Sequence, residues 1–141
     1  MMKKVFYIAE ILAVMILLLT ATLSCSASNL TASLGKEFTL PVGQTAVISG
    51  ENLTLKFVEM TGDSRCAKGV ECIRAGDAKC QMLITFNGST SDVLFTQQGG
   101  GETVQDFLNY YKASFVLEPY PEYGKTIDKS DYKLVMTVTK Q

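Results

Sequence analysis

The chain has 141 residues, with 13 basic and 14 acidic side chains, four cysteines, and neither histidine nor tryptophan. Without histidine it lacks Ser-His-Asp and Cys-His catalytic units, histidine zinc sites and the usual general base near neutral pH. A net charge of −1 also leaves no excess of basic residues for binding nucleic acid. We therefore expect a protein that is not an enzyme, holds no metal or cofactor, and does not bind nucleic acid.

The N-terminus is typical of an export signal. Two lysines follow the initial methionines, and an apolar run with an uninterrupted core over residues 11–19 comes next. The end of this run, Thr22-Leu23-Ser24-Cys25, resembles the lipobox of bacterial lipoproteins, in which a small residue precedes the cysteine that receives lipid. The resemblance implies a lipoprotein-type signal peptide over residues 1–24, and lipid attachment at Cys25.

A lipid on Cys25 would anchor the protein to the cell membrane or outer envelope, on the extracytoplasmic face. Two alternatives remain open. Cleavage after Ala27 would release a soluble, secreted protein. An uncleaved run over residues 5–23 could instead span a bilayer, with Glu10 near one end.

Loss of residues 1–24 would leave 117 of the 141 residues, enough for one domain with its own core. The removed part contains Lys3, Lys4 and Glu10, so 11 basic and 13 acidic side chains remain and the net charge becomes −2. Residues 25–34 are mostly small and polar, which is typical of a flexible tether. We expect the folded domain to occupy residues 35–141.

Short alternating runs fill the first half of that domain. Residues 36–40, 44–48 and 53–60 read as strands separated by turn residues. In the third run the apolar parity changes after Phe57, which indicates a β-bulge. Residues 78–86 alternate most clearly.

The second half continues the pattern. Asn87-Gly88 predicts a hairpin that returns over residues 92–96, and residues 97–101 read as a glycine-rich loop. Apolar residues at helical spacing predict a short helical turn over residues 104–111. Strands follow over residues 112–118 and 132–139. About seven short strands predict an all-β fold, an antiparallel sandwich or barrel.

Five residues separate the two cysteines of the segment 63–76, a spacing that suits a disulfide in an oxidising compartment. We predict a Cys66–Cys72 disulfide. The alternative is a zinc thiolate site, which usually needs four ligands, and only Cys80 is near enough to join. Cys80 alternates with apolar residues and is expected to be a buried thiol.

Asp63-Ser64-Arg65-Cys66, followed by Gly69-Val70, Cys72 and Ala75-Gly76, resembles a widespread domain of bacterial exported proteins and lipoproteins. That domain typically reads Asp-Ser-Arg-Cys-Pro, a spacer, then Cys-hydrophobic-Trp-Ala-Gly. This chain has Ala67 and Arg74 where proline and tryptophan are common. The resemblance implies an exported, β-rich protein and no particular activity.

Within this segment, Asp63, Arg65, Gly69 and Gly76 are expected to fix the loop. Asp63 and Arg65 would pair with each other or cap backbone amides, and the glycines would form turns. Aromatic residues on loops often contact ligands. The candidate binding surface comprises Tyr110, Tyr111, Tyr120 and Tyr123.

An anchor joined to a β scaffold without catalytic parts favours a binding or structural module of the cell envelope, whose partner would be an envelope protein or glycan. The first alternative is a protease inhibitor of the chagasin type, an exported β-sandwich with a glycine-rich inhibitory loop that Gly99-Gly100-Gly101 resembles. The second is a small glycan hydrolase that uses two carboxylates.

Overall fold

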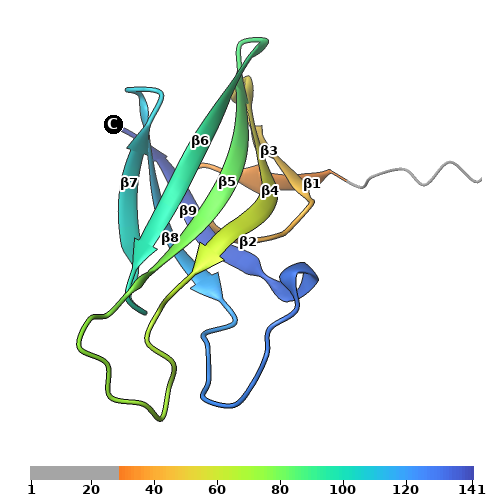
Figure 1. Cartoon of the computed structure of the whole chain (residues 1–141). Coiled ribbons are helices and arrows are strands. Elements are labelled where there is room, and N and C mark those ends of the chain that lie inside the picture. Colours follow the sequence, from red (N-terminus) through yellow and green to blue (C-terminus); the bar gives the residue numbers. More distant parts are fainter. Residues whose placement is uncertain (1–28) are drawn as a thin grey trace, which may run out of the picture.

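The structure is a computed structural model that describes residues 29–141. The expected signal segment and the predicted lipid attachment residue, Cys25, lie outside these residues. The described part forms two facing β-sheets with one short 3₁₀ turn and no α-helix (Figure 1). The predicted all-β sandwich is therefore confirmed, and the sheets do not close into a barrel. No helix within residues 29–141 is long and apolar enough to cross a membrane.

The elements in chain order are β1 (Leu30–Ser33), β2 (Glu37–Pro41), β3 (Thr45–Ser49), β4 (Leu53–Asp63), β5 (Asp77–Phe86), β6 (Ser89–Gln98), β7 (Thr103–Phe107), β8 (Tyr111–Glu118), η1 (Lys129–Asp131) and β9 (Lys133–Lys140). The first sheet has the order β1-β3-β4-β5-β6, and the second has the order β2-β9-β8-β7. All neighbours are antiparallel except β1 and β3, which are parallel.

The core lies between the two sheets and follows from the alternation in the sequence. On β5 every second residue from Ala78 to Ile84 is fully buried, because its side chain points to the facing sheet. Phe95 of β6 stacks on Phe115 of β8 with ring centroids 5.1 Å apart, which joins the sheets directly. Each large buried side chain contributes about 1.5–3 kcal/mol relative to its exposed state.

Two features read from the sequence are confirmed in detail. The register of β4 against β5 shifts after Phe57 and again after Met60, so the expected bulge is present and is followed by a second. Asn87 and Gly88 connect β5 to β6 with φ values of 49° and 82°, the conformation of the tight hairpin turn that this pair favours.

The expectations for the tether and for residues 104–111 were wrong. Leu30–Ser33 forms a strand rather than part of a tether, because it pairs with β3 and buries Ala32. Residues 103–107 form β7, not a helical turn. The helical spacing was misleading because Val104 and Phe107 lie on opposite faces of the strand: Phe107 faces the core and Val104 faces solvent. The turn that follows β7 places Leu108 and Asn109 at positive φ.

Candidate functional site

Three loops gather at one end of the sandwich. The loop 64–76 joins β4 to β5, the loop 119–132 joins β8 to β9, and the glycine loop 99–101 joins β6 to β7 (Figure 1). Contacts link all three: the Gly99 N–H donates to the carbonyl of Gly76, and the Lys68 N–H donates to the carbonyl of Pro121, both at 2.9 Å. This end of the molecule contains the sequence segment with the cysteines.

The Cys66–Cys72 disulfide closes the tip of the loop 64–76, with Cα atoms 5.9 Å apart. Beneath it the loop has a hydrogen-bonded stem. The Cys66 N–H donates to the Ala75 carbonyl at 2.9 Å, and the Ser64 N–H donates to the Asp77 carbonyl at 2.7 Å. The predicted disulfide is therefore present, and the loop is also held by backbone bonds below it.

Gly76 is required by the geometry of this stem. Its φ is +69°, and a Cβ atom there would lie 1.8 Å from the carbonyl oxygen of Ser64, a separation that no side chain tolerates. Gly69 also has a positive φ, of +87°, but the nearest atom to a Cβ there is 3.9 Å away. Both glycines serve the loop, as expected, and at Gly76 the close backbone approach adds a second constraint.

The bulges of β4 bring Asp63 and Arg65 towards the end of the core. Asp63 pairs in register with Ala78, whose side chain is fully buried, so the Asp63 side chain lies on the inner face. Its side chain is 11% exposed and that of Arg65 is 0% exposed. The predicted pairing of these two residues is thus a buried ion pair rather than a surface contact.

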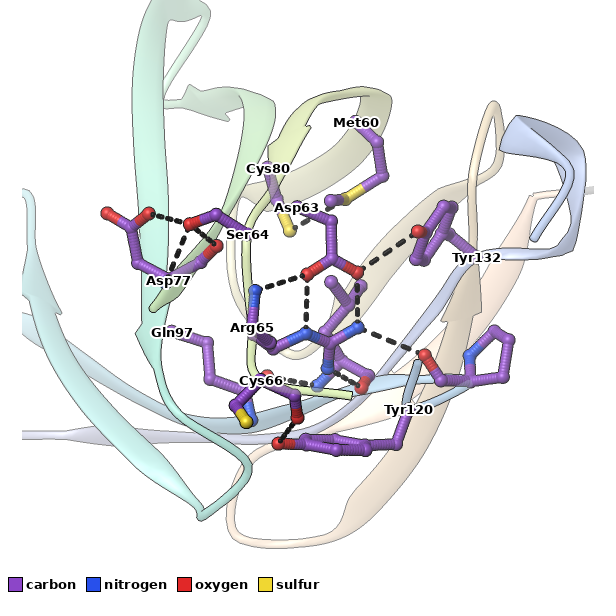
Figure 2. Close-up of polar contacts among 12 residues, drawn as sticks. Met60, Asp63, Ser64, Arg65, Cys66, Asp77, Cys80, Gln97, Tyr120 and Tyr132 are labelled. Carbon is purple, nitrogen blue, oxygen red and sulfur yellow. Dashed lines mark hydrogen bonds and ion pairs between the residues drawn. The ribbon is translucent and has the colours of Figure 1, made fainter. Parts of the chain in front are cut away.

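Arg65 joins the two sheets (Figure 2). Its Nε and Nη2 donate to the two carboxylate oxygens of Asp63 at 2.9 and 2.7 Å. Its Nη1 donates to the carbonyl of Leu117 at 2.7 Å, and its Nη2 also donates to the carbonyl of Pro119 at 3.0 Å. Arg65, two residues beyond the end of β4, therefore binds the end of β8 in the opposite sheet.

The Asp63 carboxylate accepts four hydrogen bonds. Besides the two guanidinium bonds, Oδ1 accepts the Arg65 backbone N–H at 3.2 Å, and Oδ2 accepts the Tyr132 hydroxyl at 3.0 Å. Burial acts to raise the pKa of Asp63, but the bonds and charge of Arg65, together with the Tyr132 hydroxyl, outweigh it and hold the pKa below its ordinary value. Asp63 is therefore a charged structural anchor.

Two side chains take the place of a missing strand beside β8. β7 begins at Thr103, opposite Phe115, so the outer edge of Leu117 has no strand partner. The Leu117 N–H instead donates to Oε1 of the buried Gln97 at 2.7 Å, and its carbonyl accepts the bond from Arg65. Both the N–H and the carbonyl on the outer edge of Leu117 therefore have hydrogen-bond partners, as buried backbone groups require.

Tyr120 connects the second long loop to the first. Its hydroxyl donates to the Cys66 carbonyl at 2.7 Å, and the guanidinium of Arg65 lies 5.1 Å from its ring centroid. A Cβ atom on Gly100 would lie 2.5 Å from the Tyr120 ring, so a glycine at this position admits the aromatic side chain. Tyr120, one of the four candidate surface tyrosines, therefore supports the disulfide loop from below.

The four tyrosines do not form one surface. Tyr110 and Tyr111 stand at the start of β8, and Tyr120 and Tyr123 follow its end, so the two pairs lie at opposite ends of the sandwich (Figure 1). Tyr111 is only 1% exposed and packs in the core, where its hydroxyl donates to Glu51 at 2.8 Å. Residue spacing alone did not distinguish this core position from its exposed neighbour Tyr110.

Cys80 is a free, buried thiol, as expected. Its Sγ lies 3.5 Å from the sulfur of Met60 (Figure 2). Burial raises the pKa of Cys80 to about 12 despite the opposing charge of Arg65, so the thiol is protonated at neutral pH and unreactive. Within residues 29–141, no three His, Cys, Asp or Glu side chains come together to hold a metal ion.

The outer surface of this end is apolar in places. Ile73 and Val70, near the tip of the disulfide loop, are 104% and 43% exposed, and Tyr123 on the neighbouring loop is 76% exposed. The disulfide at Cys72 and the stem bond at Ala75 hold the backbone on either side of Ile73, and the bond from the Tyr123 N–H to Lys68 holds the backbone of Tyr123. Large exposed apolar groups on an ordered loop are typical of contact surfaces.

Sequence reasoning missed three supporting residues, Gln97, Gly100 and Tyr132. A signal existed for one of them: Gln97 follows Phe95 by two residues and so occupies an inward position of β6, where a polar side chain needs a buried partner. The roles of Gly100 and Tyr132 depend on loop packing that no local pattern encodes.

Comparison with known proteins identified no relative: no family model matches the chain, and neither the curated proteins nor the solved structures contain a significant match.

Proposed function

We propose that this protein is a lipid-anchored binding module of the bacterial cell envelope, exposed on the extracytoplasmic side, and that it contacts an envelope protein or glycan through the disulfide loop 64–76. The observation that carries the proposal is that the loop combines two features: exposed apolar side chains at its tip and a buried ion pair at its base. A loop needed only to connect β4 to β5 requires neither.

The physical reason is preorganisation. A flexible loop loses conformational entropy when it binds, and this loss weakens affinity. Here the disulfide, the backbone stem and Arg65 fix the loop before any partner arrives. Ile73 directly follows the disulfide, and the Tyr123 N–H is bonded to the Lys68 carbonyl, so both exposed side chains project from a held backbone. Interfaces depend most on a few such residues.

The test is site-specific crosslinking in cells that export the full chain. A photoreactive residue at Tyr123 should give one discrete adduct with an envelope component, and Ile73→Asp should abolish it. Val104 is 58% exposed on β7 and provides the matched control, so Val104→Asp should leave the adduct unchanged. Absence of a discrete adduct, or equal loss in both variants, would contradict the proposal.

The anchor is tested separately. Mass spectrometry of the membrane-extracted protein should find diacylglyceryl-modified Cys25 at a new N-terminus. Recovery of a soluble chain that begins at Ser28 would show that the protein is secreted rather than lipid-anchored. Recovery of a membrane-bound chain that still begins at residue 1 would show an uncleaved transmembrane anchor.

A protease inhibitor of the chagasin type is the second candidate. The observation that favours it is the position of the loop 99–101 beside the disulfide loop, where the Gly99 N–H bonds to the Gly76 carbonyl. Several loops at one end of a sandwich can enter a protease cleft together. Nanomolar inhibition of a cysteine protease by the purified chain, lost in Ile73→Asp, would establish this function, and no inhibition across a panel would exclude it.

A further inference from the structure

A recess of about 550 Å³ opens beside the disulfide loop, between the glycine loop and the end of β8. Its volume falls in the range of small-molecule sites, roughly 300–1,000 Å³, and the recess is more open to solvent than enclosed. Pro119 and Tyr120 supply an apolar wall, while Lys68 and Glu118 supply charges. A mixed lining of this kind suits a ligand that has both an apolar face and polar groups.

The charge in the recess is unbalanced. Glu118 is paired with Lys133 at 3.4 Å, whereas none of the ion pairs among residues 29–141 involves Lys68. The backbone of Lys68 is fixed, since its N–H donates to the Pro121 carbonyl and its carbonyl accepts the Tyr123 N–H at 3.0 Å. The Lys68 ammonium lies 5.7 Å from the centroid of the Tyr120 ring, and its charge adds to the Lys125 bond in lowering the pKa of Glu122 without forming an ion pair. It is therefore available to form a charge-assisted bond with an anionic ligand.

The backbone beside the recess is already occupied. The outward N–H and carbonyl of Leu117 are bonded to Gln97 and Arg65, so an extended peptide cannot add to the sheet at this edge. A ligand in the recess must therefore contact the side chains or the backbone of Gly100, and a compact, ring-shaped ligand fits these contacts better than a peptide strand.

We propose that the recess binds a carboxylated sugar residue of an envelope glycan. The Lys68 ammonium holds the sugar carboxylate by a charge-assisted hydrogen bond, and the Pro119 and Tyr120 rings pack against the C–H face of the sugar. The inference rests on the proposed binding function and names its ligand class, but it places the ligand in the recess rather than on the loop tip.

The experiment measures binding of a galacturonic acid trimer to the purified full chain by calorimetry and by NMR shifts of the Gly100 and Tyr120 amides. Lys68→Met should weaken binding tenfold or more, because a charge-assisted bond is lost while the apolar stem of the side chain is kept. Lys56→Met is the matched control: Lys56 is exposed on β4, remote from the recess, and the change in net charge is the same. It should leave the affinity unchanged.

The uncharged galactose trimer should bind at least tenfold more weakly than the acidic one. Equal binding of the two trimers would overturn the assignment to an anionic sugar, as would equal losses in the Lys68 and Lys56 variants. If an acidic peptide shifts the same amides and binds more tightly than the galacturonic acid trimer, the ligand of the recess is a protein rather than a glycan. If no probe shifts these amides while the Tyr123 crosslink persists, the recess assignment fails and the binding function stands.

Discussion

Removal of the Arg65 guanidinium is the most informative perturbation of this protein. Arg65→Met keeps the length of the side chain but leaves the carbonyls of Leu117 and Pro119 without their donor, and leaves the Asp63 carboxylate with two of its four bonds. Loss of one partner of a buried pair costs about 3–5 kcal/mol. For a domain of this size, that corresponds to a fall of about 10–20 °C in the thermal midpoint.

The assay is thermal unfolding followed by circular dichroism at pH 7 with the disulfide intact. Lys133→Met is the control, because it breaks the exposed ion pair with Glu118, where both side chains are nearly half exposed. Such a pair contributes about 1 kcal/mol or less. A fall of less than about 4 °C for Arg65→Met, comparable to the control, would refute the reasoning.

A double-mutant cycle separates the pair from its surroundings. Asp63→Asn and Arg65→Met should each destabilise the protein, and the double variant should be more stable than the sum of the two losses predicts, by about 2 kcal/mol or more. Losses that add within about 0.5 kcal/mol would show that the two residues act independently.

The pair also predicts an acid dependence. The folded-state pKa of Asp63 is depressed below the ordinary 3.8, so its stabilising contribution is complete above that pH and is lost as the pH falls through the folded value. The difference in unfolding free energy between the native protein and Asp63→Asn should therefore narrow below about pH 4. A constant difference down to pH 2 would contradict the assignment.

Three further outcomes follow from the loop and the core. Cys66→Ser should lower the thermal midpoint by several degrees, since closure of so short a loop contributes roughly 2 kcal/mol; an unchanged midpoint would mean that the stem alone holds the loop. Gly76→Ala should destabilise far more than Gly69→Ala in urea unfolding, because both have positive φ but only Gly76 meets a backbone oxygen; equal costs would remove the close approach as the cause. In a spectrophotometric alkaline titration, Tyr111 and Tyr132 should ionise late, because burial foremost, and then the adjoining carboxylates, raise the pKa of each from 10 to about 12. The neutral hydroxyls therefore stabilise the folded state fully below pH 10, and this contribution is lost as the pH rises through about 12. Replacement of either residue by phenylalanine should remove one late-ionising group, and an unchanged late phase would contradict its assignment.

The parts of the fold that local pattern controls were predictable. The alternation of β5 marks its buried face, because strand side chains point to opposite sides at every step. Asn87-Gly88 specifies its turn through positive φ at both positions. The parity change after Phe57 revealed the bulge for the same geometric reason.

The parts controlled by distant contacts were not predictable. Leu30–Ser33 becomes a strand only because β3 lies beside it. Sequence reasoning paired Arg65 with Asp63, two residues away, but could not find the carbonyls of Leu117 and Pro119, which are 52 and 54 residues away. Those partners depend on how the two sheets face each other.

Amide hydrogen exchange over residues 64–76 tests the central claim most directly, namely that Arg65 fixes the disulfide loop against the opposite sheet. In the native protein the N–H groups of Cys66 and Lys68 are bonded to Ala75 and Pro121, so both should exchange slowly. In Arg65→Met, at a temperature where the variant remains folded, both should exchange at least tenfold faster while β5 amides keep their relative protection. Unchanged protection of Cys66 and Lys68 in that variant would contradict the account.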